Sequence, residues 1–264
     1  MTTTRQFSLA LEALLELKAD VASPSLRAKP VLAAPTLSGV LAELGSLPRE
    51  ALFLGIAPDG LPVLLNLHDP IPGPLLITGE AGSGKTSLLR MVAMAAQQTH
   101  RAENVQFVVI TNQPSEWENM LATDHYAGIF SVDHESAKDL LLSLSSWAHA
   151  NKSRQSVLLL VDDLEAITKM DSDALQNFRW LLLRGTAHRA WPIVTMNAER
   201  YGEVLAWIPT FRTRIFGRIE KRDVAEAVGA EVASGLDRLE AGIQFSLREN
   251  GNWLRFWLPN CSET

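Results

Sequence analysis

The sequence predicts an α/β sandwich with a mainly parallel central sheet, and three observations lead to that prediction. First, short apolar runs alternate with segments of helical periodicity, which is the pattern of consecutive βαβ units. Second, the runs 105–110 and 157–161 are almost continuously apolar, as expected for strands that are buried on both faces. Third, a chain of 264 residues with 47% hydrophobic and 20% charged side chains can fill one large core.

The charge balance is acidic, because 30 Asp and Glu residues against 24 Lys and Arg give a net charge of -6. Such a chain is not attracted as a whole to nucleic acid or to anionic membranes, so any contact with DNA would have to be local. The single cysteine, Cys261, fits a reducing cytoplasm, and no apolar run approaches the length of about 18 residues that a membrane span needs. We therefore expect a cytoplasmic protein without membrane insertion.

We expect residues 1–50 to form an N-terminal helix and a proline-rich covering segment, followed by the main domain at 51–264. Apolar residues at helical spacing in the first stretch indicate one buried helix face: Phe7, Leu11, Leu14 and Leu15. That face could pack on the main domain or on another subunit. Nine of the thirteen prolines lie between Pro24 and Pro74, and the runs 51–56 and 62–67 around a Pro-Asp-Gly turn predict a β-hairpin that completes a β-rich lobe.

A glycine loop follows the apolar run that begins at Leu75, and a helical pattern follows the loop. The loop matches GxxxxGK[ST], in which backbone N–H groups and the start of a helix surround a phosphate group. Lys85 adds a full positive charge, and the Thr86 hydroxyl is a ligand for Mg²⁺. The alternative is a purely structural glycine turn. The predicted phosphate-binding residues are Gly79, Glu80, Ala81, Gly82, Ser83, Gly84, Lys85, Thr86 and Ser87.

Two aspartates end the apolar run 157–161. We expect Asp162 to hold Mg²⁺ through water, opposite Thr86. The strand 105–110 intervenes in the chain between the glycine loop and this acidic strand. That order is typical of the ATPase branch with an additional strand, in which a carboxylate next to the magnesium aspartate activates water. Asp163 is the predicted catalytic carboxylate.

The remaining elements continue the alternation. Helical patterns cover 133–150 and 173–184, and the strand 192–197 ends at Asn197, whose amide either positions the attacking water or caps a turn. A further strand at 214–219 and a helix at 222–228 precede a C-terminal β-hairpin, in which Asn250-Gly251 joins the strands 242–247 and 253–257.

From about Leu54 to Leu258 the sequence resembles the FtsK/HerA superfamily of ring-forming motor ATPases. The resemblance rests on the order of several pieces: the hairpin, the glycine loop, the acidic strand end, the segment 181–185 and the segment 208–215. It implies a RecA-like P-loop NTPase fold with ATP and Mg²⁺ as cofactors. It further implies ATP hydrolysis in a homo-oligomeric ring such as a hexamer, acting on double-stranded DNA or another translocated polymer.

Two residues depart from that family, which usually has a glutamate where Asp163 stands and a glutamine where Asn197 stands. Both side chains are one methylene shorter, which predicts either a slow ATPase or a protein that binds nucleotide without turnover. The family also implies an arginine that completes the site from the neighbouring subunit, and Arg184 and Arg214 occupy the matching segments. The alternative is that both are ordinary surface arginines, with Arg184 complementing a helix dipole.

Two function hypotheses follow. The first is an ATP-driven motor on double-stranded DNA, supported by the resemblance and by the basic cluster Arg212, Arg214, Arg218, Lys221 and Arg222. The second is a nucleotide-dependent assembly or scaffold protein, for secretion or defence, with slow or no hydrolysis. Seven tryptophans could line its interface, although each could equally pack in the core. A replication-type AAA+ ATPase is disfavoured, since no helical-lid pattern follows Leu258.

Overall fold

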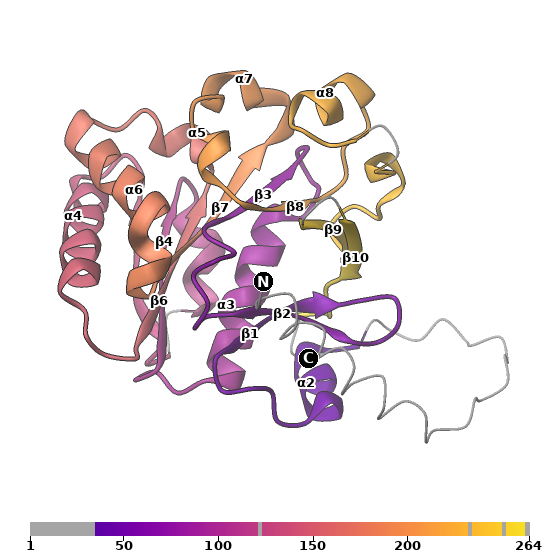
Figure 1. Ribbon diagram of the computed structural model, residues 1–264, viewed down its shortest axis with the longest axis horizontal. Helices are drawn as coiled ribbons and strands as arrows, with labels where there is room; N and C mark the ends of the chain where they lie inside the picture. Colours follow the sequence, from indigo (N-terminus) through magenta and orange to yellow (C-terminus); the bar gives the residue numbers. More distant parts are fainter. Residues whose placement is uncertain (1–34, 121–122, 232–233, 250–251, 262–264) are drawn as a thin grey trace, which may run out of the picture. The chain divides into compact units, whose positions relative to one another are not determined.

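The computed structural model describes residues 35–120, 123–231, 234–249 and 252–261 (Figure 1). The predicted N-terminal helix and the Asn250-Gly251 turn lie outside the described residues. The first described helix is α2, Leu37–Leu44, which begins where the Thr36 hydroxyl accepts a hydrogen bond from the Gly39 backbone N–H. Asn260 is paired with the start of this segment, since Leu37 N donates to Asn260 O and Asn260 N donates to Pro35 O.

A ten-stranded sheet with the order β2-β1-β10-β9-β8-β3-β7-β6-β4-β5 forms the centre of the domain. The strands that run parallel to one another are β3 (Leu75–Gly79), β4 (Val105–Thr111), β5 (Tyr126–Ser131), β6 (Ser156–Asp162), β7 (Ala190–Asn197) and β8 (Thr213–Phe216). The antiparallel extension consists of β1 (Ala51–Ile56), β2 (Pro62–Asn66), β9 (Gln244–Glu249) and β10 (Asn252–Trp257). The predicted α/β class with a mainly parallel sheet and a C-terminal hairpin is therefore confirmed.

The position of the additional strand differs from the expectation. In the sheet, β7 lies between β3 and β6, whereas β4 lies on the far side of β6. The chain order alone suggested that the strand 105–110 was the additional one. Long-range pairing decides which strand lies between β3 and β6, as in the pairing of Gly79 with Asn197. Local sequence patterns do not show this pairing.

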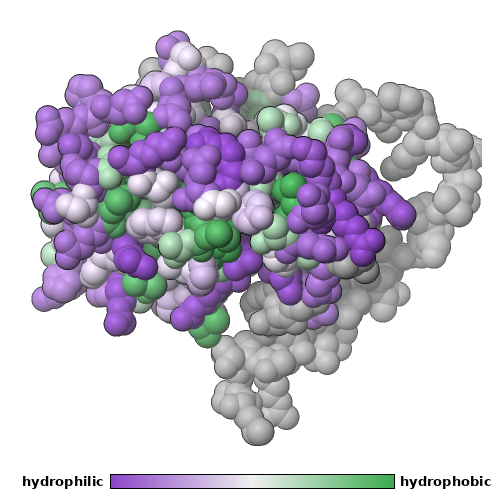
Figure 2. Space-filling view, turned by 90° about the horizontal axis from the view of Figure 1, so that it is seen from above, coloured by the Kyte–Doolittle hydropathy of each residue, from purple (hydrophilic) through white to green (hydrophobic). Residues whose placement is uncertain are grey.

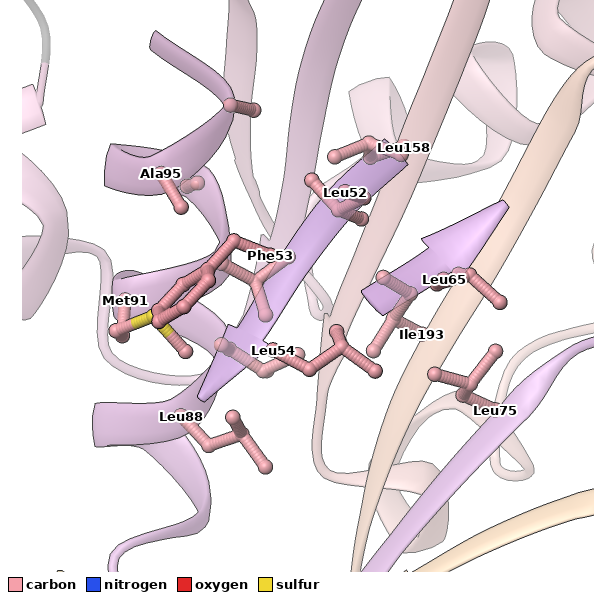
Figure 3. Close-up of a cluster of buried hydrophobic side chains, with 14 of the residues drawn as sticks. Leu52, Phe53, Leu54, Leu65, Leu75, Leu88, Met91, Ala95, Leu158 and Ile193 are labelled. Atoms are coloured by element: carbon pink, nitrogen blue, oxygen red, sulfur yellow. The ribbon is translucent and has the colours of Figure 1, made fainter. Parts of the chain in front are cut away.

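Helices cover both faces of the sheet. On one face α3 (Lys85–Thr99) packs against β1, and Figure 3 shows Phe53 of β1 beside Met91 and Leu88 of α3. On the other face α4 (Glu135–Ala150) and α6 (Ser172–Arg184) contribute Leu141, Phe178 and other apolar residues to a second core. The near-continuous burial of β3, β4, β6 and β7 follows from this two-sided cover.

The edge strand β5 was not predicted. It lies at the edge of the sheet, where five of its six residues are only partly buried. Such a strand does not need the continuous apolar sequence of a central strand, and the apolar pattern is therefore weak. The other helices are short: α5 (Leu164–Ile167), α7 (Tyr201–Val204), α8 (Arg222–Ala227) and the 3-10 turns η1 (Pro114–Met120), η2 (Gly185–His188), η3 (Ala198–Arg200), η4 (Ile208–Thr210) and η5 (Leu236–Arg238). None of the helices described here is both long and apolar enough to cross a membrane.

Candidate nucleotide-binding site

The glycine loop lies between the end of β3 and the start of α3, at the carboxyl ends of the parallel strands. Gly84 caps α3 in the left-handed conformation, with φ 88°, and a Cβ atom there would lie 2.5 Å from Gly242 Cα. Gly82 also has a positive φ, of 73°. Both positions therefore require glycine, for conformation at Gly82 and for conformation and space at Gly84. Seen from this end, the surface is mostly hydrophilic with separate hydrophobic areas (Figure 2).

The side chain of Lys85 folds back over the glycine loop. Its ammonium donates to Gly79 O at 3.1 Å and to Glu80 O at 2.7 Å. Burial lowers the pKa of Lys85, and attraction by Asp162, Glu165 and Asp163, in decreasing order, opposes that effect. The positive charge is thus held at the centre of the loop, where a phosphate group would lie.

Thr86 and Asp162 come together from elements that are 76 residues apart in the chain. Thr86 Oγ1 donates to Asp162 Oδ2 at 2.9 Å, and Thr195 Oγ1 of β7 donates to Asp162 Oδ1, also at 2.9 Å. Burial raises the pKa of Asp162, while the two hydroxyl donors lower it. A hydroxyl and a carboxylate are the oxygen ligands that Mg²⁺ prefers, so this pair fits a magnesium ion. The role of Thr195 was not predicted, because its position on the neighbouring strand depends on the order of the sheet.

Asp163 is held by contacts on several sides. Its backbone has φ 97°, which is rare for a residue with a side chain, and its N–H donates to Thr195 Oγ1 at 2.8 Å. One carboxylate oxygen caps α5 by accepting from Glu165 N, and the other lies 3.6 Å from Arg200 Nη1. The predicted catalytic carboxylate is therefore at the site, and part of its hydrogen-bonding capacity is already used.

Glu165 is a site residue that the sequence prediction missed. Its side chain is 0% exposed, Oε1 accepts from Asn197 N at 2.8 Å, and Oε2 has no hydrogen-bond partner among the described residues. Burial is the main cause that raises the pKa of Glu165 to about 8, and repulsion by the nearby Asp163 carboxylate acts in the same direction. Three of the four residues at 162–165 are carboxylates, and the sequence prediction used only the first two of these, Asp162 and Asp163.

Asn197 ends β7 in register with Gly79, so its backbone lies beside the glycine loop. Its side-chain oxygen accepts from Glu199 N at 3.1 Å and caps η3, which is the turn-capping alternative considered for this residue. In the same turn Arg200, which the sequence prediction also missed, donates to both oxygens of Glu203 at 2.8 Å.

The two candidate arginines lie in different surroundings. Arg184 is exposed at the end of α6, without a hydrogen bond or ion pair to any described residue, and it borders a cavity of about 250 Å³ together with Ile71 and Leu183. Arg214 of β8 is half-buried and donates to Val228 O at 3.3 Å and Ile208 O at 3.4 Å. Neither side chain bonds to the glycine loop of its own domain within the described ranges.

Beside the loop, a cavity of about 1000 Å³ extends along α3 from Ser87 to Gln98. Its lining is mixed, with Arg90, Gln97 and Asn260 among the polar residues and Met94 and Ile243 among the apolar ones. Because its lining begins at Ser87, the last residue of the glycine loop, the cavity has room for the base and sugar of a nucleotide.

Three of the five residues of the basic cluster pair with carboxylates, whereas Arg212 is exposed and has no hydrogen bond or ion pair to any described residue. Arg218 pairs with Glu220 at 2.8 Å, Lys221 with Glu199 at 2.7 Å and Arg222 with Glu226 at 2.9 Å. Arg214 is engaged with backbone carbonyls, as described above. The acidic partners offset the charge of this segment.

The model of the family described as Novel STAND NTPase 1 matches residues 62–232. That segment contains the glycine loop, Asp162, Asp163, Glu165 and Asn197. Among curated proteins no match was found.

Several solved structures have the same fold. The cytoplasmic domain of the type VII secretion ATPase EccC from Thermomonospora curvata aligns with a TM-score of 0.66 at 18% identity, covering 92% of this chain and 29% of that one. ATPases 2 and 3 of EssC from Geobacillus thermodenitrificans align with a TM-score of 0.66 at 13% identity, covering 90% and 48%. The chain thus spans less than half the length of these proteins. The likeness confirms the predicted RecA-like P-loop ATPase fold.

Proposed function

The chain belongs to the Novel STAND NTPase 1 family, and from this premise we propose that it binds ATP with Mg²⁺ at the loop 79–87 and hydrolyses it. The observation that carries the proposal is the contact of 2.9 Å between Thr86 Oγ1 and Asp162 Oδ2. It unites the end of the phosphate-binding loop with the end of the acidic strand, which is what a nucleotide-bound magnesium ion requires.

Within this proposal each side chain has a definite task. Lys85 exchanges the carbonyl oxygens of Gly79 and Glu80 for phosphate oxygens, and Thr86 and Asp162 hold the metal ion. When bound, Mg²⁺ offsets the negative charge that develops on the phosphate oxygens. Asp163 or the buried Glu165 accepts a proton from the attacking water, and Asn197 places that water.

We further propose that the site is completed by Arg184 of a neighbouring copy in a homo-oligomeric ring. The exposed guanidinium has no partner among the described residues of its own chain, and it stands beside Ile71 and Leu183, whose exposed fractions are 57% and 60%. Such apolar side chains favour contact with another protein surface. Arg214 is the second candidate, but it would first have to leave two backbone carbonyls.

The proposed role of hydrolysis is movement of a polymer, with double-stranded DNA as one candidate. A second function, nucleotide-dependent assembly with slow or no hydrolysis, is favoured by one specific observation. Arg218, Lys221 and Arg222 are paired with carboxylates, which weakens the attraction of this segment for DNA phosphates.

Three measurements on the wild type and the Lys85→Ala variant test these proposals. They are ATP turnover with and without double-stranded DNA, DNA binding at two salt concentrations, and native mass with and without ATP and Mg²⁺. The motor proposal expects turnover that DNA stimulates, DNA affinity that falls with salt, and a larger nucleotide-dependent oligomer, all lost or reduced in Lys85→Ala. Assembly without turnover would favour the second function. No turnover together with a native mass that does not change with ATP and Mg²⁺ would contradict both.

A further inference from the structure

A small basic cavity lies at the amino ends of the parallel strands, at the opposite end of the sheet from the glycine loop. Its volume is about 50 Å³, and its lining includes Val105 and Ser156 at the starts of β4 and β6 and Arg189 just before β7. The segment preceding β1 adds Arg49 and Glu50, and the segment preceding β6 adds Arg154. A single water occupies about 30 Å³ of liquid volume, so the space suits one small polyatomic group.

The charges around this cavity are unbalanced. Arg49, Arg154 and Arg189 supply three positive charges, and Glu50 supplies one negative charge. Arg189 is 17% exposed and is fixed by bonds to Glu50 Oε2 at 2.8 Å and to Leu67 O at 3.1 Å. Arg49 and Arg154 have no hydrogen bond or ion pair to any residue that the structure describes. Two exposed guanidinium groups therefore border the cavity without a hydrogen bond or ion pair that would hold them in place.

Burial alone would raise the pKa of Glu50, but the attraction of Arg189, His68 and Arg154 outweighs burial and lowers it. Glu50 therefore stays ionised, and its negative charge balances the positive charge of one guanidinium, that of Arg189. It does not neutralise the other two.

Polar groups that could complete a ligand site also line the cavity. Ser156 is only 2% exposed, and no described residue makes a hydrogen bond to its hydroxyl, which can both donate and accept. His100 lines the same space, and its Nδ1 is paired with Thr99 Oγ1 at 2.8 Å. The other ring nitrogen, Nε2, is buried and has no hydrogen-bond partner among the described residues, which favours a ligand at this position.

We propose that this cavity binds a phosphate group carrying two negative charges, either as inorganic phosphate or as the terminal group of a small phosphate monoester. Guanidinium groups match the tetrahedral oxyanion in geometry and in charge, and the buried serine supplies a further hydrogen bond. The bound group would join four segments: the residues before β1, the α3–β4 turn, and the starts of β6 and β7. It would therefore stabilise the domain as well as occupy the site.

The nucleotide loop is itself a phosphate site, so the test uses the Lys85→Ala variant as its background. Binding of inorganic phosphate and of glycerol phosphate is measured by titration calorimetry at constant ionic strength, together with the shift in Tm. The proposal expects binding by at least one of the two probes in Lys85→Ala. The added change of Arg49 and Arg154 to alanine should weaken that binding by at least about tenfold.

Arg101→Ala is the matched control, because Arg101 is an exposed arginine near the same end of the sheet that does not line the cavity. Its phosphate affinity should be unchanged. The two probes separate a free ion from a monoester. Failure of both to bind Lys85→Ala, or equal binding with and without Arg49 and Arg154, would overturn the proposal and leave the proposed ATPase function unaffected. Because both arginines are exposed, the double variant should fold, as its Tm without phosphate would verify.

Discussion

Glu165 accepts a hydrogen bond of 2.8 Å from the backbone N–H of Asn197, and this bond links the turn after β6 to the end of β7. Because Asn197 pairs in register with Gly79, the bond places a buried carboxylate one strand away from the glycine loop. Attraction by both Glu165 and Asp163 opposes the effect of burial on the pKa of Lys85. The end of the acidic strand therefore brings two carboxylates, Asp163 and Glu165, next to Asp162, the proposed magnesium ligand.

The first prediction separates these two carboxylates. Glu165→Gln keeps the shape of the side chain and the acceptor for Asn197 N, but removes the base. We expect kcat for ATP hydrolysis to fall by about 10²-fold or more while ATP binding is retained. Asp163→Asn, which preserves the cap on α5, should have a smaller effect. The reverse order of the two effects would assign the catalytic role to Asp163.

The second prediction concerns pH and stability. The pKa of Glu165 is raised from 4.5 to about 8, so the native state holds a proton that the unfolded chain releases. The free energy of unfolding should therefore fall as the pH rises from about 4.5 to about 8, without further change from this group outside that range. Urea unfolding of the nucleotide-free protein at pH 5 and pH 8 measures the difference. Glu165→Gln should reduce it, whereas the exposed Glu43→Gln should not.

The third prediction compares two glycines of the loop. Alanine in the left-handed conformation costs about 1–2 kcal/mol at either Gly82 or Gly84. Only at Gly84 would the added Cβ also meet the Gly242 backbone, at 2.5 Å, whereas at Gly82 it meets no atom within 4 Å. We expect Gly84→Ala to lower the free energy of urea unfolding more than Gly82→Ala, and to abolish ATP binding. Equal losses would show that the contact with Gly242 does not limit the loop.

The fourth prediction tests the arginine from the neighbouring copy. Arg184→Ala should leave Tm and ATP binding unchanged and lower turnover by about 10³-fold or more. Arg214→Ala should instead lower Tm, since it removes two bonds to buried backbone. Mixing inactive Arg184→Ala with inactive Lys85→Ala should restore part of the activity, because mixed interfaces contain an intact loop and an intact arginine. No recovery on mixing, in an assembly shown to be oligomeric, would contradict action between subunits.

Local patterns alone predicted much of this protein. The continuous apolar character of Val105–Thr111 and Ser156–Asp162 reports burial on both faces, and the glycines of the loop report backbone conformations that other residues rarely adopt. Lys85, Thr86 and Asp162 could be proposed as site residues from local patterns too, because the proposed chemistry depends on residue types next to a strand end. These features are encoded within a few residues of each other.

The tertiary structure decided what depends on contacts between distant segments. It placed β7 between β3 and β6, brought Thr195 to Asp162, and buried Glu165 while leaving Asp162 and Asp163 partly exposed. It also paired Arg218, Lys221 and Arg222 with carboxylates, and it left Arg184 exposed while half-burying Arg214. The environment of a charged side chain is set by strands and turns far away in the chain, so its pKa, its partners and its access to a ligand are properties of the fold and not of the local sequence.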